Sequence, residues 1–257
     1  REMLDRPEAE YGGEMLYVNK SDTKPMWMME YCRDEALRWY WNSWSYPFHK
    51  EGDGPLYRNA PADAYNHNND EFARELVARW YEYWLERPGS GTKVNSGGAK
   101  IVFSDTNTYG RNEMNYRVSG VVDAMRLPKD AFYVHQVMWD GWVSPETDRT
   151  YIVGHWNYDA RTVKPVYVAS TADEVELLLN GRSLGRKRLP AAGTPPELTW
   201  RVAYAEGELK AIGYRNGAKV ADDVIRTAGK PARLVVSAST DTLCADGLDL
   251  AYIDYTV

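Results

Sequence analysis

The sequence is poor in cysteine, histidine and phenylalanine, and it has no long apolar run. Two cysteines among 257 residues are too few for a disulfide framework. The four histidines lie far apart without metal-ligand spacing, so we expect no metal site and no cofactor. No stretch of 18 residues is apolar, which argues against a transmembrane helix and a membrane partner.

The chain also lacks an excess of positive charge. It carries 37 acidic and 31 basic residues, which gives a net charge of −6 at pH 7. A nucleic-acid binder usually shows a basic face, so we expect no nucleic-acid partner. The apolar fraction of 44% is enough for sizeable cores, and the length allows one large domain or two to three small ones.

Tryptophan and tyrosine are abundant instead. There are ten Trp and 19 Tyr against four Phe. Such amphipathic rings line pockets for ligands that are partly apolar and partly hydroxylated. Nine of the ten Trp precede residue 160, so the two halves of the chain differ in composition.

The first half alternates between apolar runs and helical periodicity. The predicted elements, in order, are a strand at 26–29, a helix at 71–86, a strand at 100–103 and a helix at 129–139. Pro128 is expected at the first helical position of the last of these. Such alternation builds parallel sheets. Each strand runs into polar residues, as in a barrel with its site at the carboxyl ends of the strands.

From about residue 151 the pattern becomes all-β. Six strands are predicted, at 163–168, 175–179, 182–188, 198–203, 209–214 and 219–225. Asn180-Gly181 and Asn216-Gly217 lie between strand pairs and predict type I′ hairpins. This density of short strands favours an immunoglobulin-like β-sandwich. After a linker at 227–231, residues 232–257 would begin a second β-sandwich.

These patterns divide the chain into 1–145, 146–229 and 230–257. Residues 248–257 alternate like a strand but stop without a turn, and natural domains avoid such an unpaired edge. We therefore expect the chain to be a piece of a longer protein. The alternative is a complete protein with frayed ends.

Three stretches carry a family resemblance. They are Lys24-Pro-Met-Trp-Met-Met-Glu-Tyr31, the segment 119–133, and the segment 154–229 with its Gly154-His-Trp156 and Val175-Glu-Leu-Leu-Leu-Asn-Gly-Arg-Ser-Leu-Gly185 motifs. Together they resemble glycoside hydrolase family 2, the β-galactosidase and β-glucuronidase family. The resemblance implies a multidomain α/β plus β fold: the last strands of a (β/α)8 TIM barrel, an immunoglobulin-like β-sandwich and the start of a second β-sandwich.

The resemblance also implies a retaining β-glycosidase, β-galactosidase-like, that hydrolyses terminal β-linked sugars from a carbohydrate substrate. Such enzymes need two carboxyl groups about 5–5.5 Å apart. By its match to the family, Glu30 is the nucleophile and Tyr31 borders the sugar. The alternative is that Glu30 is a strand-end carboxylate paired with a nearby arginine such as Arg33.

The acid/base of the family is the Glu of an Asn-Glu pair after the fourth barrel strand, and the resemblance places that strand before Arg1. Asn112-Glu113 is such a pair, but it follows no apolar run, so we do not expect it to be the acid/base. The chain by itself is then expected to be inactive.

Three further residues are candidate substrate contacts. Asp105 and Asn107 follow the second predicted strand, on the same expected face as Glu30, although both could simply cap the loop. Trp44 could stack on a sugar ring or pack within its own loop. The family often places a Trp near this strand end, and the segment 103–105 has none.

Two other functions compete with the enzyme. One is a non-catalytic carbohydrate-binding or structural β-sandwich module of a cell-surface or secreted protein; the other is a homologue that has lost catalysis. A surface stripe of aromatic rings would favour the binding module. The rings available for it are Trp156, Tyr167, Trp200, Tyr204 and Tyr214. A periplasmic or secreted location is favoured, and an oligomer is possible.

Overall fold

The computed structural model describes residues 12–15, 24–31, 70, 73–74, 77, 95–100, 102–106, 120–143, 146–189 and 197–257. The chain divides into two compact units, residues 1–226 and 227–257. Within the described ranges, no helix has the length and apolar character needed to cross a bilayer.

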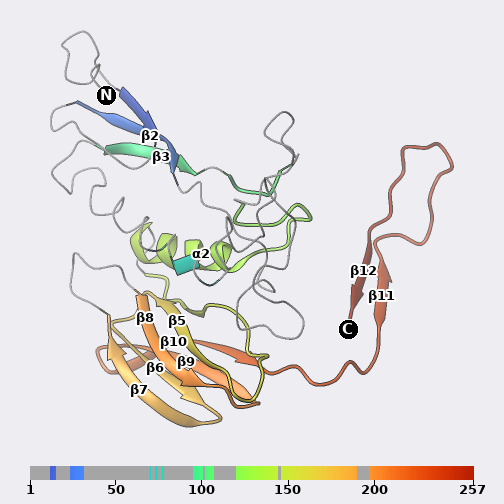
Figure 1. Ribbon diagram of the computed structural model, residues 1–257. Helices are drawn as coiled ribbons and strands as arrows, with labels where there is room; N and C mark the ends of the chain where they lie inside the picture. Colours follow the sequence, from blue (N-terminus) through green and yellow to red (C-terminus); the bar gives the residue numbers. More distant parts are fainter. Residues whose placement is uncertain are drawn as a thin grey trace, which may run out of the picture. The chain divides into compact units, whose positions relative to one another are not determined.

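The first described strands form a parallel three-stranded sheet (Figure 1). Its order is β1 (Gly12–Met15), β2 (Met26–Tyr31) and β3 (Asn95–Lys100). The strand predicted at 26–29 is confirmed as β2, which lies in the centre and continues through Tyr31. Strand β1 was not predicted from the sequence.

The second predicted strand, at 100–103, is misplaced by several residues. The ladder with β2 is formed by the preceding segment, in which Gly97 pairs with Trp27 and Gly98 with Met28. Glycines carry no β-propensity signal, but strand formation depends on the neighbouring strand more than on intrinsic preference. The predicted strand therefore overlaps β3 at Lys100, and Val102 and Phe103 lie beyond the end of β3.

Helix α2 (Asp130–Val143) confirms the helix predicted at 129–139 and extends it by four residues. Pro128 is not its first residue, because it forms an isolated antiparallel bridge with Val122 two positions before the helix. Asp130 places an acidic side chain in the first turn, where the helix dipole favours it. The described residues of the helix predicted at 71–86, which are Ala73, Arg74 and Val77, are helical.

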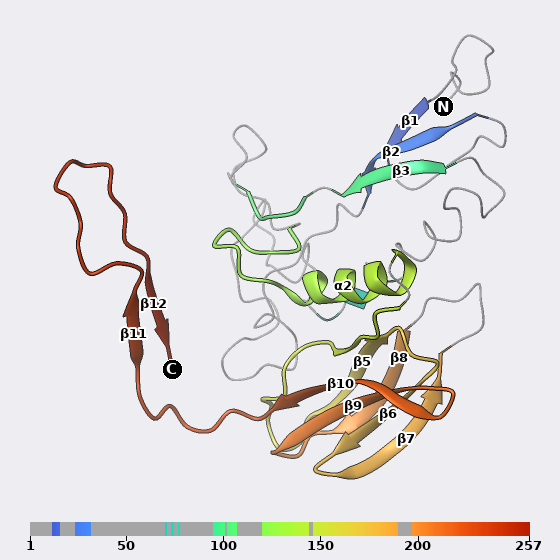
Figure 2. The same cartoon turned by 180° about the vertical axis from the view of Figure 1, so that it is seen from behind.

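A β-sandwich of seven strands follows. Figures 1 and 2 show it from opposite sides. One sheet has the order β4 (Thr150–Ile152), β5 (Val163–Ser170), β8 (Glu197–Ala203). The other has the order β10 (Ala218–Arg226), β9 (Glu208–Arg215), β6 (Glu174–Leu179), β7 (Arg182–Arg188). All neighbours within the two sheets are antiparallel. The six predicted strands are confirmed to within two residues at each end.

The two predicted hairpin turns are confirmed as well. Asn180 and Gly181 have φ angles of 51° and 78°, and Asn216 and Gly217 have 51° and 79°. Two consecutive residues with positive φ are what a type I′ turn requires, and its twist matches that of the flanking strands.

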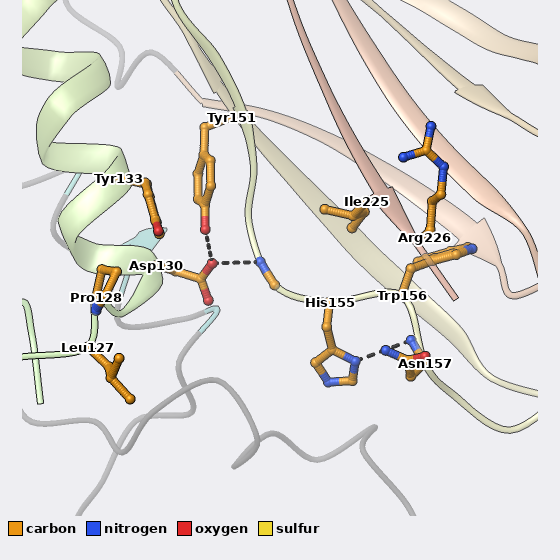
Figure 3. Close-up of a pocket in the computed structure, with 11 residues that line it drawn as sticks. Leu127, Pro128, Asp130, Tyr133, Tyr151, His155, Trp156, Asn157, Ile225 and Arg226 are labelled. Carbon is orange, nitrogen blue, oxygen red and sulfur yellow. Dashed lines mark hydrogen bonds between the residues drawn. The ribbon is translucent and has the colours of Figure 1, made fainter. Parts of the chain in front are cut away.

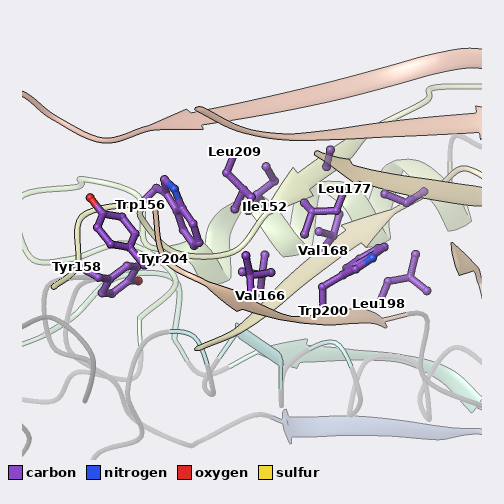
Figure 4. Packing of buried hydrophobic residues seen from close by; sticks show 13 residues of the cluster. Ile152, Trp156, Tyr158, Val166, Val168, Leu177, Leu198, Trp200, Tyr204 and Leu209 are labelled. Carbon is purple, nitrogen blue, oxygen red and sulfur yellow. The ribbon is translucent and has the colours of Figure 1, made fainter. Parts of the chain in front are cut away.

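The sandwich core lies between the two sheets (Figure 4). Its largest side chains are Trp156 and Trp200, which are 1% and 4% exposed. Each buried indole N–H has a partner: Trp156 Nε1 donates to the Ala205 carbonyl over 2.9 Å, and Trp200 Nε1 donates to the Gly185 carbonyl over 3.3 Å. The core therefore buries two polar groups without leaving a donor unsatisfied.

The two faces of strand β5 pack in two different hydrophobic clusters. Val166 and Val168 point into the sandwich, whereas the alternate residues Tyr167 and Ala169 pack in a second cluster. That cluster contains Val134, Val137 and Met138 of α2 together with Ala73 and Val77. Successive side chains of a strand point to opposite faces, so α2 covers the outer face of β5.

The second unit is a hairpin of β11 (Val235–Ala238) and β12 (Ile253–Thr256), paired antiparallel. Its apolar side chains, such as Val236 and Tyr255, are exposed. A two-stranded hairpin by itself is marginally stable in water. The prediction that residues 232–257 begin a second β-sandwich stays a prediction.

Two glycines with positive φ allow a test of the sandwich. A Cβ at Gly207 (φ 126°) would lie 2.0 Å from Asn180 Oδ1, which accepts the Glu208 N–H over 2.8 Å. A Cβ at Gly217 (φ 79°) would meet nothing within 4 Å. We expect Gly217→Ala to lower the free energy of unfolding by about 1 kcal/mol and Gly207→Ala by at least about 2 kcal/mol. Urea unfolding measures both, and equal losses would contradict the assigned packing.

Candidate functional site

The predicted nucleophile lies at the carboxyl end of β2. Glu30 pairs with Met15, the last residue of β1, and Tyr31 pairs with Lys100, the last residue of β3. Because the three strands are parallel, their carboxyl ends meet at one edge of the sheet. In open and closed α/β sheets this is the edge that carries ligand sites. The structure describes the backbone of Glu30 and Tyr31 at this edge and not their side chains.

The structure describes some of the other predicted site residues and not others. Trp44 and Asn107 lie outside the described residues, as do Arg33 and Glu113, so their roles stay predictions. Asp105 is described, five residues beyond the end of β3.

Asp105 is tied into the segment that leads to α2. Its Oδ1 accepts a hydrogen bond from the Gly120 amide over 2.9 Å and from Lys129 Nζ over 2.8 Å. The Lys129 side chain is fully buried and that of Asp105 is 12% exposed. Burial raises the pKa of the Asp105 carboxyl above its ordinary value, although the Lys129 ammonium opposes this shift. The pair thus gives Asp105 a structural role, whatever its role toward a substrate.

Backbone contacts hold the same segment in place. The Asp105 amide donates to the Val122 carbonyl over 3.0 Å, and the Val121 amide donates to the Phe103 carbonyl over 3.0 Å. A Cβ at Gly120 would lie 2.2 Å from the Asp105 nitrogen, so this close approach requires glycine. The residues after β3 are therefore fixed to the residues before α2.

A second polar cluster lies where the helices meet the sandwich. Lys164 Nζ on β5 donates to Asp70 Oδ2 over 2.6 Å and to the Tyr158 hydroxyl over 2.9 Å. Lys164 and Asp70 are 1% and 0% exposed. Burial disfavours the ammonium, but the Asp70 carboxylate and Tyr158 outweigh this effect and raise the pKa of Lys164. Asp70 Oδ1 is buried without a hydrogen-bond partner in the described part of the chain.

Asp130 is the second buried carboxyl at this junction. Its Oδ1 accepts a hydrogen bond from the Tyr151 hydroxyl over 2.5 Å and from the Gly154 amide over 3.0 Å. Burial, and after it the charge of Asp70, raises the pKa of Asp130 from 3.8 to about 6. Asp130 thus links the start of α2 to β4 and to the loop after it.

A crevice of about 520 Å³ opens beside Asp130 (Figure 3). Tyr133 of α2 and Tyr151 of β4 line one side, and their rings are stacked with centroids 4.9 Å apart. His155 and Asn157, in the loop between β4 and β5, line another part. Ile225 and Arg226 at the end of β10 complete it. In the described residues, no group of three or more His, Cys, Asp or Glu side chains is placed to hold a metal ion.

Sequence reasoning missed both buried clusters. A lysine inside the apolar strand sequence Val163-Lys-Pro-Val-Tyr-Val168 is a signal for a buried, paired charge, because lysine is almost never fully buried without a partner. Its partner Asp70 is 94 residues away in the sequence, so no local pattern identifies it.

Part of the chain matches a family model, and most of it is similar to curated glycosidases. Residues 161–221 match a family model described as a domain of unknown function, DUF4982. A β-glucuronidase of Formosa agariphila is 35% identical over 243 residues, which are 91% of this chain and 22% of that protein. The β-galactosidase BoGH2A of Bacteroides ovatus is 35% identical over 54% of this chain and 16% of that protein.

Solved structures give the same result. A β-glucuronidase from glycoside hydrolase family 2 matches with a TM-score of 0.70 and 33% identity, over 90% of this chain and 23% of that chain. A family 2 member from Bacteroides cellulosilyticus matches with a TM-score of 0.55 and 26% identity, over 71% of this chain and 25% of that chain. The predicted resemblance to glycoside hydrolase family 2 is therefore confirmed. The chain spans about a fifth of the length of the curated relatives it matches.

The buried ion pair predicts unequal effects of lysine substitutions. We expect Lys164→Met to lower the free energy of unfolding by about 3–5 kcal/mol, because it leaves Asp70 charged and buried without its partner. Lys164→Met/Asp70→Asn should recover part of that loss. The control is Lys210→Met, which breaks the partly exposed pair with Asp222 and should cost about 0–1 kcal/mol. Similar losses from the two single substitutions, measured by urea unfolding, would contradict the burial of Lys164.

Asp130 predicts a pH dependence of stability. Between its ordinary pKa of 3.8 and about 6, the folded state keeps a proton that the unfolded state has lost. Stability therefore falls as the pH rises through this window, by up to about 3 kcal/mol from this group. Asp130→Asn removes the charge and keeps an acceptor oxygen for Tyr151. Relative to the parent chain, it should gain stability between pH 4 and pH 8.

Thermal unfolding at both pH values measures this gain. Asp159→Asn is the matched control, because Asp159 lies exposed in the turn before β5. A gain that is the same for the two substitutions, or absent for Asp130→Asn, would show that Asp130 is not held in a desolvated environment.

Proposed function

We propose that the chain is the end of the catalytic domain and the following β-sandwich of a family 2 retaining β-glycosidase, which hydrolyses terminal β-linked sugars from oligo- or polysaccharides. One observation carries the proposal. A central parallel strand ends in Glu30-Tyr31 at the carboxyl edge of its sheet, in a chain that is 35% identical over 91% of its length to a β-glucuronidase.

In this proposal Glu30 is the nucleophile. Its carboxylate forms a bond to the anomeric carbon as the glycosidic bond breaks, and a second carboxyl group protonates the departing oxygen. Water then attacks the glycosyl-enzyme, and the second group takes up the proton of that water. The second group is expected before Arg1. A strand position suits a nucleophile, because a backbone paired on both sides holds it within a narrow range of positions.

Tyr31, Trp44, Asp105 and Asn107 are the proposed sugar contacts. Asp105 has the clearest physical role among them, because its pairing with the buried Lys129 fixes the segment 120–129 beside the end of β3. We infer that Asp105 acts mainly by holding the segment 120–129, because its side chain is 12% exposed.

The proposed architecture is a partial (β/α)8 barrel over 1–145, an immunoglobulin-like sandwich over 146–229 and the start of a second sandwich over 230–257. The parallel order of β1, β2 and β3 supports the barrel. The packing of α2 on β5 supports a scaffolding role for the sandwich.

A binding module is the alternative, and the burial of the sandwich aromatics argues against it. Trp156, Tyr167, Trp200 and Tyr204 are at most 8% exposed. The fifth ring, Tyr214, is partly exposed but donates its hydroxyl to Glu176 and lies under the Arg186 guanidinium. The five rings named for a surface stripe therefore do not form one.

The nucleophile is tested by Glu30→Gln in the full-length protein, with an aryl β-glucuronide and an aryl β-galactoside as substrates. Glutamine keeps the shape of the side chain and cannot form the glycosyl-enzyme. We expect kcat to fall by at least about 10³-fold while thermal unfolding stays unchanged.

The matched control is Glu113→Gln, which changes the other candidate carboxylate and should keep most of the turnover. A mechanism-based 2-deoxy-2-fluoro glycoside should add its glycosyl mass to the peptide that contains Glu30. Near-normal hydrolysis by Glu30→Gln, or labelling of a different carboxylate, would refute the assignment.

A further inference from the structure

We propose that the crevice beside Asp130 is a second carbohydrate-binding site, which takes one pyranose ring of an oligosaccharide. The choice of a sugar as ligand rests on the proposed function; the site itself rests on the crevice. It is built from α2, β4, the loop after β4 and β10 (Figure 3), and none of these elements contributes Glu30.

The size of the crevice fits a small ligand. Its volume of about 520 Å³ lies within the range of roughly 300–1,000 Å³ that small-molecule sites occupy. It exceeds what a single water needs, and its walls come from segments far apart in the sequence that the fold brings together.

An oriented aromatic ring forms one wall. Tyr133 is 36% exposed and its ring stacks on Tyr151 with an interplanar angle of 25°. The Tyr151 hydroxyl is in turn bonded to Asp130. This chain of contacts holds the Tyr133 ring in one orientation before any ligand arrives, which reduces the entropy that binding must overcome. A sugar presents an apolar face of C–H groups that packs on such a ring.

Polar groups surround the ring. The loop after β4 brings an imidazole and an amide to the crevice, from His155 and Asn157, and the His155 ring is oriented by stacking on Tyr158 with centroids 4.5 Å apart. Donors and acceptors placed around an aromatic platform match a ligand that is apolar on its faces and hydroxylated at its edge.

The charges of the lining favour a sugar over a phosphorylated ligand. Among the described residues that line the crevice, Asp130 is the one acidic residue, and Arg226 is the one Lys or Arg. The Arg226 guanidinium already donates to Glu208 over 2.6 Å. A phosphate site normally gathers several positively charged donors, and the described part of this lining does not.

The test uses the full chain carrying Glu30→Gln, so that turnover does not consume the probe. The probes are methyl β-D-galactopyranoside and methyl β-D-glucuronide, measured by isothermal titration calorimetry and by saturation-transfer NMR. We expect a binding event that Tyr133→Ala weakens by about tenfold or more and that Tyr133→Phe retains. Trp139→Ala, an exposed ring on α2 outside the crevice, is the matched control and should bind like its parent.

Should Tyr133→Ala fail to fold, Leu127→Trp provides a second test, because Leu127 lines the crevice and is 49% exposed. A bulkier side chain there should block the ligand. Binding that is the same in the parent, Tyr133→Ala and Leu127→Trp chains would overturn the proposal, as would the absence of binding by both probes. Hydrolysis of aryl glycosides by the unmodified full-length protein tests the proposed function separately, since it does not need the crevice.

Discussion

A lysine without access to solvent joins the helical part of the chain to the β-sandwich. Lys164 reaches Asp70, which is 94 residues earlier, and the two side chains are fully buried. Separating such charges in a medium of low dielectric would be costly, so the pair favours the arrangement of the two segments in which Lys164 and Asp70 meet. The near-continuous burial of β5 follows from this arrangement, because one face of the strand packs in the sandwich and the other against α2.

The same junction concentrates negative charge. Two buried carboxyls, Asp70 and Asp130, lie near the ammonium of Lys164, and burial together with the charge of Asp70 raises the pKa of Asp130. Hydrogen bonds from Tyr151 and Gly154 orient that group, so the start of α2 is held to β4 and the loop after it. A crevice with an oriented tyrosine wall is the result of this close approach of α2, β4 and β10.

Asp105 and Lys129 form a further ion pair at the start of α2, in which the lysine side chain is fully buried. Their pair fixes the segment after β3 to the segment before α2. In the proposed glycosidase, the position of Glu30 is then tied through β3, Lys129 and α2 to the sandwich. The role that this proposal gives the sandwich is to support the edge of the sheet that carries Glu30.

Local patterns in the sequence determined most of the secondary structure. Apolar alternation and two Asn-Gly pairs located the sandwich strands and hairpins, and the run before Glu30 located β2, because these signals act between near neighbours. The pairing of Lys164 with Asp70, the burial of Asp130, the glycine-rich strand β3 and the crevice were decided by the tertiary structure alone. Each depends on residues that only folding brings together. Burial and pairing between residues far apart in the sequence produce no local pattern from which they could be predicted.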